Sequence, residues 1–364
     1  MTHYTVVISD GADHDAGFRG SSAFWSLATR VGSYAELGLY WFLCSYYGRS
    51  RVSLLRPSQL LRMRSPHKTD WLFVGLPTRV SEEHLKKIEF RHLVLYDSND
   101  RLGRKVSKCG VNFGRSDKSF LLSQTNMCLK TWRDDRINYP CRIGLLPIKR
   151  PPWNNKLHVA ERWRGAKQRL GFQPVKVFDV GFVARPTGDL KKNQRVRWLV
   201  DLKRERPDLK LWGGLVGGRR WREYADQTDA LDRELLQPCW LECRKVGFFQ
   251  YFTGLRRSKV ALAPAGYAPW SYRHFEAIYA RSIVVSNDLS HYEFLIPFPR
   301  DGMVEVPDGE SVVGGIEEAL ELQEKRPDLA ERNVQQLDRW LDQGLYSRRR
   351  PEALARFWAQ IKNN

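Results

Sequence analysis

Three side chains close together in the sequence could bind a phosphorylated ligand. Ser271 stands near the start of an expected helix, Arg273 lies in its first turn, and Glu276 lies one turn further on. Unpaired N–H groups and the positive end of the helix dipole favour an anion at a helix N-terminus. Arg273 adds a fixed positive charge, and the Glu276 carboxylate can accept hydrogen bonds from ligand hydroxyl groups. This spacing indicates a site for a polar ligand that carries phosphate.

The neighbouring sequence predicts the elements that would position these side chains. Residues 260–263 form an apolar run typical of a buried strand, residues 264–270 form a loop rich in Pro, Gly and aromatic residues, and a second buried strand is expected over 283–286. In open α/β sheets, ligands bind outside the carboxyl ends of the strands, where such loops lead into helices. We therefore expect the loop and the helix start to lie at that edge of a sheet.

This stretch, residues 255–298, resembles the exostosin-type glycosyltransferases and their relatives with the GT-B fold. The matching residues are Leu255, Ser258, Leu262, Pro264, Gly266, Ser271, Arg273, Glu276, Ala277, Pro297 and Phe298. The family usually has Gly-Cys-Ile-Pro-Val where this chain has Ala-Arg-Ser-Ile-Val-Val at 280–285, so the Gly and the Pro are missing. The close match covers roughly 45 of the 364 residues, and a looser one extends back to about Val175.

The resemblance implies a nucleotide-sugar-binding half. In it, Ser271 and Arg273 would contact the phosphates of the donor, and Glu276 would hold hydroxyl groups of the ribose or the sugar. The donor site would also include Gly266, Tyr267 and Tyr272. Arg185 follows the first strand of this half, and its guanidinium suits bidentate phosphate binding. An exposed arginine at a strand end is the structural alternative.

Strand-like and helical patterns alternate in both halves of the chain, which favours parallel sheets with crossover helices. Strands are expected over 4–9, 71–75, 92–96, 121–123, 143–148, 175–184, 209–212 and 246–249, and helices over 23–48, 194–206, 315–324, 329–341 and 351–362. The fold class is α/β, with two Rossmann-like domains that face each other across a cleft, as in GT-B enzymes. The glycines at 213, 214, 217 and 218 are interpreted as a loop with positive φ.

The domain boundaries follow from these patterns. Residues 1–150 form an acceptor-binding domain, and residues 151–172 form a linker, marked by the prolines of the preceding Lys-Arg-Pro-Pro run. Residues 173–345 form the donor-binding domain. Residues 346–364 form a C-terminal helix that packs back on the N-terminal domain, as the final helix commonly does in two-domain glycosyltransferases.

The loop after the first strand offers candidates for a catalytic base. A transfer that inverts the sugar needs a group to accept the acceptor's proton, and Asp13, His14 or Asp15 is predicted to do so. A turn held by Asx hydrogen bonds and a divalent-metal site are the alternatives. Relatives with the GT-B fold generally need no metal, so none is expected. Arg19, Asp97 and Asp100 are predicted to contact the acceptor.

Charge is distributed unevenly along the chain. The net charge is +19, and residues 101–170 hold 17 Lys and Arg against 4 Asp and Glu. Such a field concentrates an anionic partner, which could be nucleic acid, an anionic bilayer or a phosphorylated glycan. Residues 38–63 place aromatic side chains ahead of several arginines, which suits either a surface resting on a membrane or a crossover helix with a buried aromatic face.

These observations favour an enzyme. We expect a glycosyltransferase that moves a sugar from a nucleotide-sugar donor to an anionic glycan or lipid-linked acceptor, in the synthesis of cell-surface polysaccharide or lipopolysaccharide. No cofactor beyond the co-substrate is expected. The chain start lacks a signal-peptide pattern and the six cysteines form no Cys-x-x-Cys pair, which favours the cytoplasm, at or near the inner face of the membrane.

Two alternatives remain. One is a basic nucleic-acid-binding protein without enzymatic activity. A pI of about 9.8 favours it, but the sequence contains no recognisable nucleic-acid-binding motif. The other is a catalytically inactive GT-B scaffold, against which the presence of Ser271, Arg273 and Glu276 argues.

Overall fold

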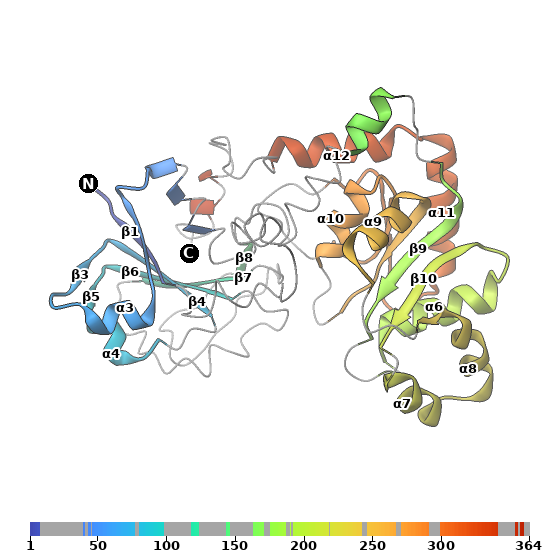
Figure 1. The fold of residues 1–364 in the computed structure, drawn as a ribbon, viewed down its shortest axis with the longest axis horizontal. Helices are drawn as coiled ribbons and strands as arrows, with labels where there is room; N and C mark the ends of the chain where they lie inside the picture. The colour runs from blue at the N-terminus through green and yellow to red at the C-terminus, as the bar shows by residue number, and fades with distance from the viewer. Residues whose placement is uncertain are drawn as a thin grey trace. The chain divides into compact units, whose positions relative to one another are not determined.

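The chain forms two compact units, each built on a parallel β-sheet (Figure 1). The computed structural model describes residues 1–7, 39–40, 43–44, 46–76, 80–97, 118–123, 143–145, 163–170, 175–186, 190, 192–217, 219–241, 246–266, 271–290, 299–340, 354–355 and 357–359. Unit 1 comprises Met1–Asn155, His291–Pro297 and Arg339–Asn364, and unit 2 comprises Lys156–Ser290 and Phe298–Asp338. The helical residues 163–169, inside the segment interpreted as a linker, therefore belong to unit 2.

Unit 1 contains a six-stranded sheet in the order β2-β1-β4-β6-β7-β8, with every neighbouring pair parallel. Its strands are β1 Tyr4–Val7, β2 Val52–Leu55, β4 Trp71–Leu76, β6 His92–Asp97, β7 Lys118–Ser123 and β8 Ile143–Leu145. The helices α3 (Pro57–Arg62) and α4 (Glu82–Leu85) and the short strands β3 (His67–Lys68) and β5 (Ile88–Glu89) complete the described elements. Val7, Leu72 and Val74 pack with Leu60 of α3 and Leu85 of α4 in one buried cluster.

The end of the chain packs within unit 1. Phe357 is fully buried, and the indole Nε1 of Trp358 donates a hydrogen bond of 2.6 Å to the hydroxyl of Tyr47. The ring of Tyr47 stacks on Tyr4 with centroids 4.3 Å apart, and Trp358 meets Trp71 edge-on at 4.8 Å. Tyr47, which belongs to the aromatic stretch at 38–63, therefore packs against other aromatic side chains.

Unit 2 contains a second six-stranded sheet, in the order β11-β10-β9-β12-β13-β14, again with every neighbouring pair parallel. Its strands are β9 Phe178–Ala184, β10 Leu211–Val216, β11 Trp240–Leu241, β12 Ser258–Ala263, β13 Ile283–Asn287 and β14 Met303–Val306. Numbered along the unit, this order is 3-2-1-4-5-6, which is the Rossmann arrangement. The strand order reverses between β9 and β12, where such sheets bind ligands.

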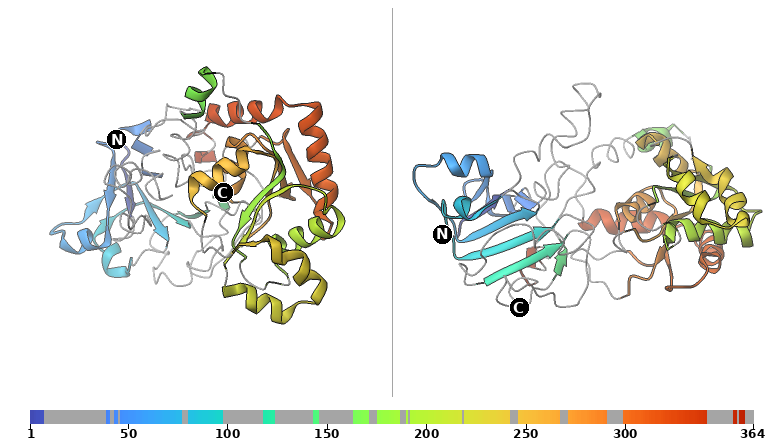
Figure 2. Two further views of the ribbon diagram at one scale, coloured as in Figure 1. Left: turned by 45° about the vertical axis from the view of Figure 1, so that its right-hand side comes forward. Right: turned by 90° about the horizontal axis from the view of Figure 1, so that it is seen from below.

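Helices cover both faces of the second sheet (Figures 1 and 2). They are α6 Gln194–Glu205, α7 Arg219–Gln227, α8 Ala230–Leu236, α9 Phe248–Arg256, α10 Tyr272–Tyr279, α11 Val312–Lys325 and α12 Leu329–Trp340. Val260, Ala261, Leu262 and Ala263 of β12 are all buried, as expected for a parallel strand covered on both sides. None of the helices in the described part of the chain is long and apolar enough to cross a membrane.

Two expectations about local structure are wrong. Residues 248–249 begin helix α9 and do not form a strand, because Phe252 and Leu255 recur at helical spacing and are buried. Gly213 and Gly214 lie within strand β10 and not in a loop, although both have the expected positive φ, of 93° and 149°. Gly217 lies just after the strand with φ of 130°, as expected. A Cβ on Gly214 would lie 1.9 Å from the carbonyl oxygen of Cys239, so the glycine permits close approach of the segment that leads into β11.

Candidate functional site

The loops after β9 and β12 are tied together by the first turn of α6. The side-chain Oε1 of Gln194 accepts a hydrogen bond of 2.6 Å from the backbone N–H of Ala265, in the loop after β12. The Nη1 of Arg195 donates one of 2.7 Å to the carbonyl of Arg185, in the loop after β9. Since these loops border the reversal of strand order, α6 fixes the edge of the sheet where a ligand would bind.

Gly266 allows the guanidinium of Arg195 to lie against the loop after β12. A Cβ at Gly266 would lie 2.2 Å from Nη2 of Arg195. Any larger residue would therefore displace this arginine or the loop. The sequence analysis overlooked Arg195. One sequence feature could have identified it. Arg195 is the second residue of the helix that follows the first strand of the Rossmann-like sheet, where ligand-binding residues are expected.

Helix α10 starts at the same edge, with Ser271 at its start as the sequence predicts. Ser271 is the N-cap residue, and its hydroxyl accepts a hydrogen bond of 3.4 Å from the backbone N–H of Arg273. The imidazole Nδ1 of His274 lies 3.2 Å from the backbone nitrogen of Ser271, which completes a capping box. The Nε2 of the same ring lies 2.8 Å from the Ser286 hydroxyl on β13. The helix start is thereby joined to the strand beside it.

His274 is fully buried, and its burial lowers the pKa of the imidazole to about 3. The nearby charge of Arg273 acts in the same direction. The ring is therefore neutral at physiological pH and positions the helix start without adding charge. His274 was not among the residues predicted from the sequence. It lies three residues after Ser271, the position from which a side chain can bond to the backbone of the N-cap residue, so the sequence contained a signal for it.

Arg273 extends across the end of β9. Its Nη2 donates a hydrogen bond of 3.1 Å to the carbonyl of Val183, and its guanidinium carbon lies 5.7 Å from the centre of the Phe182 ring. The other two guanidinium nitrogens, Nε and Nη1, are buried and make no hydrogen bond of normal geometry among the described residues, although the guanidinium lies close enough to the Tyr251 hydroxyl to oppose the rise in the pKa of Tyr251. Leaving a buried donor unpaired is costly, so these two groups point to a missing acceptor. A planar guanidinium matches the geometry of both phosphate and carboxylate groups.

Glu276 is half-buried and is held by a tyrosine from the neighbouring helix. Its Oε2 accepts a hydrogen bond of 2.8 Å from the hydroxyl of Tyr251 on α9. Burial and the charge of Glu276 raise the pKa of Tyr251 well above its usual value, against the opposing charge of Arg273. Tyr251 therefore remains a hydrogen-bond donor, and it orients a carboxylate that can accept hydrogen bonds from a ligand. The sequence analysis overlooked Tyr251.

The remaining residues predicted for the donor site divide into two groups. Arg185 follows β9 at the same edge of the sheet, with its side chain exposed. Tyr272 is the first residue of α10. Tyr267 lies outside the described residues. The structure thus brings Arg185, Gly266, Ser271, Arg273 and Glu276 to one edge of the unit 2 sheet.

Most residues predicted for catalysis and acceptor binding lie outside the part of the chain that the structure describes: Asp13, His14, Asp15, Arg19 and Asp100. Asp97 is the last residue of β6 in unit 1, at the carboxyl end of the strand. Among the described residues, no group of three or more His, Cys, Asp or Glu side chains is arranged to hold a metal ion.

Solved structures are similar to this chain in fold. A glycosyltransferase from Rickettsia africae is similar over 100% of this chain and 100% of its own, with a TM-score of 0.52 and 10% identity. The N-terminal domain of trehalose-6-phosphate phosphatase from Candida albicans is similar over 100% of this chain and 97% of its own, with a TM-score of 0.50 and 11% identity. No protein-family model and no curated protein sequence matches the chain. The fold class predicted from the sequence, α/β with two Rossmann-like parallel sheets of the GT-B type, is confirmed.

Proposed function

We propose that this protein is a glycosyltransferase that binds a nucleotide-sugar donor at the carboxyl edge of the unit 2 sheet. The observation that carries the proposal is the guanidinium of Arg273, which has two buried nitrogens that make no hydrogen bond of normal geometry among the described residues. It lies beside the start of α10 and against the end of β9, at the reversal of strand order. The likeness in fold to a glycosyltransferase supports the same conclusion.

Each residue of the site has a role in this proposal. Arg273 and the N–H groups at the Ser271 cap bind the diphosphate of the donor. Glu276, oriented by Tyr251, accepts hydrogen bonds from hydroxyl groups of the ribose or the sugar. Gly266 keeps the loop after β12 close to Arg195, and Arg185 adds positive charge at the rim. The exostosin-like pattern is part of this proposal, because it assigns the same roles to Ser271, Arg273 and Glu276.

The chemistry requires stabilisation of a leaving diphosphate. The bond between the anomeric carbon and the donor phosphate oxygen breaks, and the electron pair leaves with the diphosphate. Arg273 and the positive end of the α10 dipole stabilise the charge that develops there, which provides for transfer without a metal. The acceptor hydroxyl forms the new bond to the anomeric carbon and gives its proton to a base, for which Asp13, His14 and Asp15 are the candidates in an inverting transfer.

The acceptor is proposed to be an anionic glycan or a lipid-linked sugar, bound by unit 1 with help from Arg19, Asp97 and Asp100. The strong positive charge of residues 101–170 favours such a partner. Such an acceptor would be found in the synthesis of cell-surface polysaccharide or lipopolysaccharide at the cytoplasmic face of a membrane. Most of residues 101–170 lie outside the part of the chain that the structure describes, so only their charge supports the proposal of an anionic acceptor.

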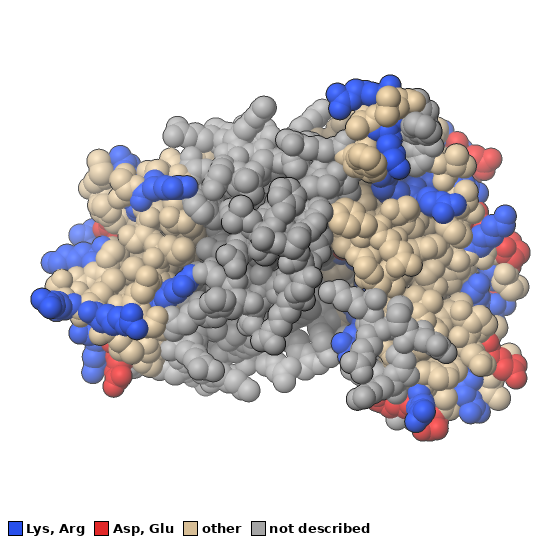
Figure 3. Space-filling view, viewed as in Figure 1, with Lys and Arg blue, Asp and Glu red and all other residues tan. Residues whose placement is uncertain are grey.

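A nucleic-acid-binding protein without enzymatic activity is the second candidate, favoured by the net charge of +19. On the face drawn in Figure 3, acidic side chains are interspersed with the basic ones over unit 2. A thermal-shift screen with nucleoside diphosphates, nucleotide sugars and duplex and single-stranded oligonucleotides distinguishes the two. Stabilisation by one nucleotide and its sugar conjugates supports the transferase. Stabilisation by oligonucleotides alone, with no response to any nucleotide sugar, would favour the second candidate.

A further inference from the structure

Exposed apolar side chains are concentrated in one part of unit 2. Among the described residues, eight large apolar side chains are exposed, and four of them fall between positions 163 and 177: Trp163 at 63%, Leu170 at 74%, Val175 at 70% and Val177 at 38%. Apolar side chains that gather on a surface mark a place where a protein contacts a partner or a membrane. None of the four belongs to the proposed donor site.

Two of these side chains share a face of the helix formed by residues 163–169, drawn in bright green in Figure 1. Trp163, Lys167 and Leu170 follow one another at spacings of four and three residues, which places them on the same side of a helix. The amino group of Lys167 lies over the ring of Trp163, 5.4 Å from its centre. Arg169 is exposed as well. This helix therefore presents an aromatic ring, a leucine and basic side chains together.

The other two apolar side chains, Val175 and Val177, are exposed on either side of a lysine that is directed inward. The Nζ of Lys176 donates hydrogen bonds of 2.7 Å to the carbonyl of Ser258 and 2.8 Å to the carbonyl of Arg281. Burial of this amino group lowers the pKa of Lys176 to about 7. The arrangement reverses the usual one, in which lysine is exposed and valine is buried.

The valines lie at the amino edge of the unit 2 sheet. Val177, Lys210 and Arg257 each directly precede a strand, namely β9, β10 and β12. The backbone N–H of Val177 donates a hydrogen bond of 2.8 Å to the carbonyl of Arg257, whose guanidinium carbon lies 5.5 Å from the centre of the Phe178 ring. Parallel strands begin at one edge of a sheet and end at the other, so this edge is opposite to the proposed donor site.

Positive charge around these apolar side chains is only partly neutralised. Asp179 accepts a hydrogen bond of 2.9 Å from the Nζ of Lys259, so this acidic side chain already has a basic partner. Lys167, Arg169 and Arg257 are exposed and make no ion pair with any residue that the structure describes. Figure 3 shows basic side chains around the helix of residues 163–169, at the top of unit 2.

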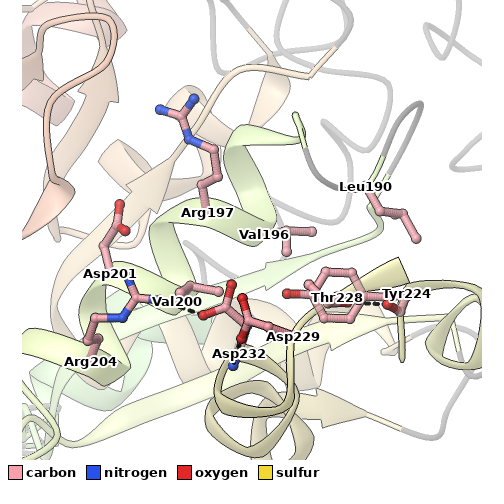
Figure 4. A pocket seen from close by; sticks show the side chains of 10 residues that line it. All are labelled: Leu190, Val196, Arg197, Val200, Asp201, Arg204, Tyr224, Thr228, Asp229 and Asp232. Carbon is pink, nitrogen blue, oxygen red and sulfur yellow. Dashed lines mark hydrogen bonds and ion pairs between the residues drawn. The ribbon is translucent and has the colours of Figure 1, made fainter. Parts of the chain in front are cut away.

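Arginines at the end of α6 are paired differently. Beside the cavity that α6, α7 and α8 line, the Nη2 of Arg204 donates a hydrogen bond of 2.5 Å to Oδ1 of Asp232, a pair that Figure 4 shows. Arg206 forms ion pairs with both Asp208 and Glu317. Unpaired cations beside exposed apolar side chains therefore distinguish the surface around residues 163–177 from this part of unit 2.

We propose that this surface of unit 2 rests on an anionic lipid bilayer. The membrane face consists of Trp163, Lys167, Arg169, Leu170, Val175, Val177 and Arg257. Its apolar side chains enter the boundary between lipid headgroups and acyl chains, and its cations contact the phosphates of the headgroups. Nucleic acid would account for the cations alone, because exposed leucine and valine side chains add nothing to phosphate binding. The apolar side chains therefore favour the bilayer.

The inference does not depend on the proposed transferase activity, because the membrane face and the donor site lie at opposite edges of the sheet. It also differs from the sequence-based hypothesis of a membrane-resting surface within residues 38–63, which belong to unit 1. Substitutions in the two units therefore distinguish the two surfaces.

The test measures flotation of the full-length protein with vesicles of phosphatidylcholine mixed with phosphatidylglycerol, and with vesicles of phosphatidylcholine alone. The mixed vesicles should bind the protein more tightly, and salt should weaken binding, because the screening length falls to about 3 Å at 1 M. Lys167→Glu combined with Arg169→Glu should weaken binding by about tenfold or more, since two attractive charges become repulsive. Trp163→Ser combined with Leu170→Ser should have an effect of about the same size, since it removes apolar contacts.

Two control variants accompany these. Arg222→Glu combined with Arg233→Glu makes the same change in net charge on α7 and α8 and should weaken binding much less. Leu61→Ser combined with Arg62→Glu alters an exposed apolar and a basic side chain of unit 1 and should also have little effect. Circular dichroism shows whether each variant has folded, and the side chains replaced on the membrane face are all exposed.

Four results would overturn the proposal. The first is that the mixed vesicles bind no better than phosphatidylcholine alone. The second is that both variants of the membrane face bind the mixed vesicles as the wild type does, whether or not the unit 1 variant loses binding. The third is that an oligonucleotide displaces the vesicles and itself binds more weakly to both variants, which would assign the surface to nucleic acid. The fourth is that sedimentation shows a dimer which Trp163→Ser with Leu170→Ser converts to a monomer, so that a second copy covers the surface.

Discussion

The hydroxyl of Tyr251 on α9 donates a hydrogen bond of 2.8 Å to Oε2 of Glu276 on α10. The two residues come from different helices, Tyr251 from the first half of α9 and Glu276 from the middle of α10. Glu276 is thus held in a fixed orientation, with one carboxylate oxygen bonded to Tyr251. This relationship gives the first prediction.

Tyr251→Phe should weaken nucleotide-sugar binding by about three- to tenfold, because it removes one hydrogen bond to a charged group while keeping the ring beside Trp212. Calorimetry measures the change. In a double-mutant cycle, the effect of Tyr251→Phe should largely vanish when Glu276 is already replaced by Gln. Full additivity of the two substitutions would show that Tyr251 does not act through Glu276.

Glu276→Gln should abolish sugar transfer and leave the fold intact, because it removes a charge that faces the donor with little change in volume. The measurement is kcat/KM for a donor identified by the nucleotide screen, with the melting temperature as a control for folding. The matched control is Glu317→Gln on α11, which removes an exposed carboxylate that pairs with Arg206. Wild-type kcat/KM in Glu276→Gln would exclude this residue from the site.

His274 should make stability depend on pH below neutrality. Burial lowers the pKa of His274 to about 3 in the folded protein, against an unfolded value of 6.5. Between pH 6.5 and pH 3 the imidazole is protonated in the unfolded chain but stays neutral in the folded protein. The free energy of unfolding therefore falls as the pH falls, by at most about 1.4 kcal/mol per pH unit.

His274→Gln should therefore reduce the loss of stability between pH 7.5 and 5.5 by about 1.4 kcal/mol, as measured by urea denaturation. Part of the dependence should remain, because burial also lowers the pKa of His67 in unit 1. If the variant and the wild type lost the same stability over this interval, His274 would not be buried in its neutral form.

Arg281 has a backbone conformation that is unusual for a residue other than glycine. It follows α10 with φ of 60°, in the left-handed region that favours glycine. Its guanidinium Nε donates a hydrogen bond of 2.5 Å to Glu331, and its Nη1 donates one of 2.9 Å to the carbonyl of Tyr279. These contacts offset the cost of the backbone conformation.

Replacing Arg281 should separate the two effects. Arg281→Ala loses the side-chain contacts and keeps the unfavourable conformation, so it should destabilise the protein. Arg281→Gly loses the same contacts but relieves the conformation, and it should be more stable than Arg281→Ala by about 1 kcal/mol. Urea denaturation of the three proteins measures this difference. Equal stability of the two variants would contradict the role given to the backbone.

Local sequence signals were sufficient for strands β1, β4, β6 and β12 and for the position of α10, whereas β2, β11 and β14 were not predicted. The apolar runs at Tyr4, Trp71, His92 and Val260 predicted strands because parallel strands are buried on both faces. The loop rich in Pro, Gly and aromatic residues before Ser271 predicted that a helix begins near this residue, and the structure shows that its hydroxyl caps the helix. Both signals are contained within a few residues, so no knowledge of the fold was required.

Contacts between distant segments could not be predicted in this way. Tyr251 and Glu276 are separated by a strand and a loop, and Arg195 reaches the loop after β9 from the following helix. The run at 246–249 was interpreted as a strand because four apolar and aromatic residues fit either element. Its helical character depends on Phe252 and Leu255, which lie beyond that run.

The most direct test of the proposed donor site is the affinity of Arg273→Ala for the nucleoside diphosphate that the screen identifies. Calorimetry should show binding weakened by about 1.5–3 kcal/mol relative to the wild type, the contribution of hydrogen bonds from a charged group. Arg326→Ala, which alters an arginine just after the last turn of α11, should bind as the wild type does. An unchanged Kd for Arg273→Ala would contradict the account, because the unpaired guanidinium nitrogens would then not face the donor.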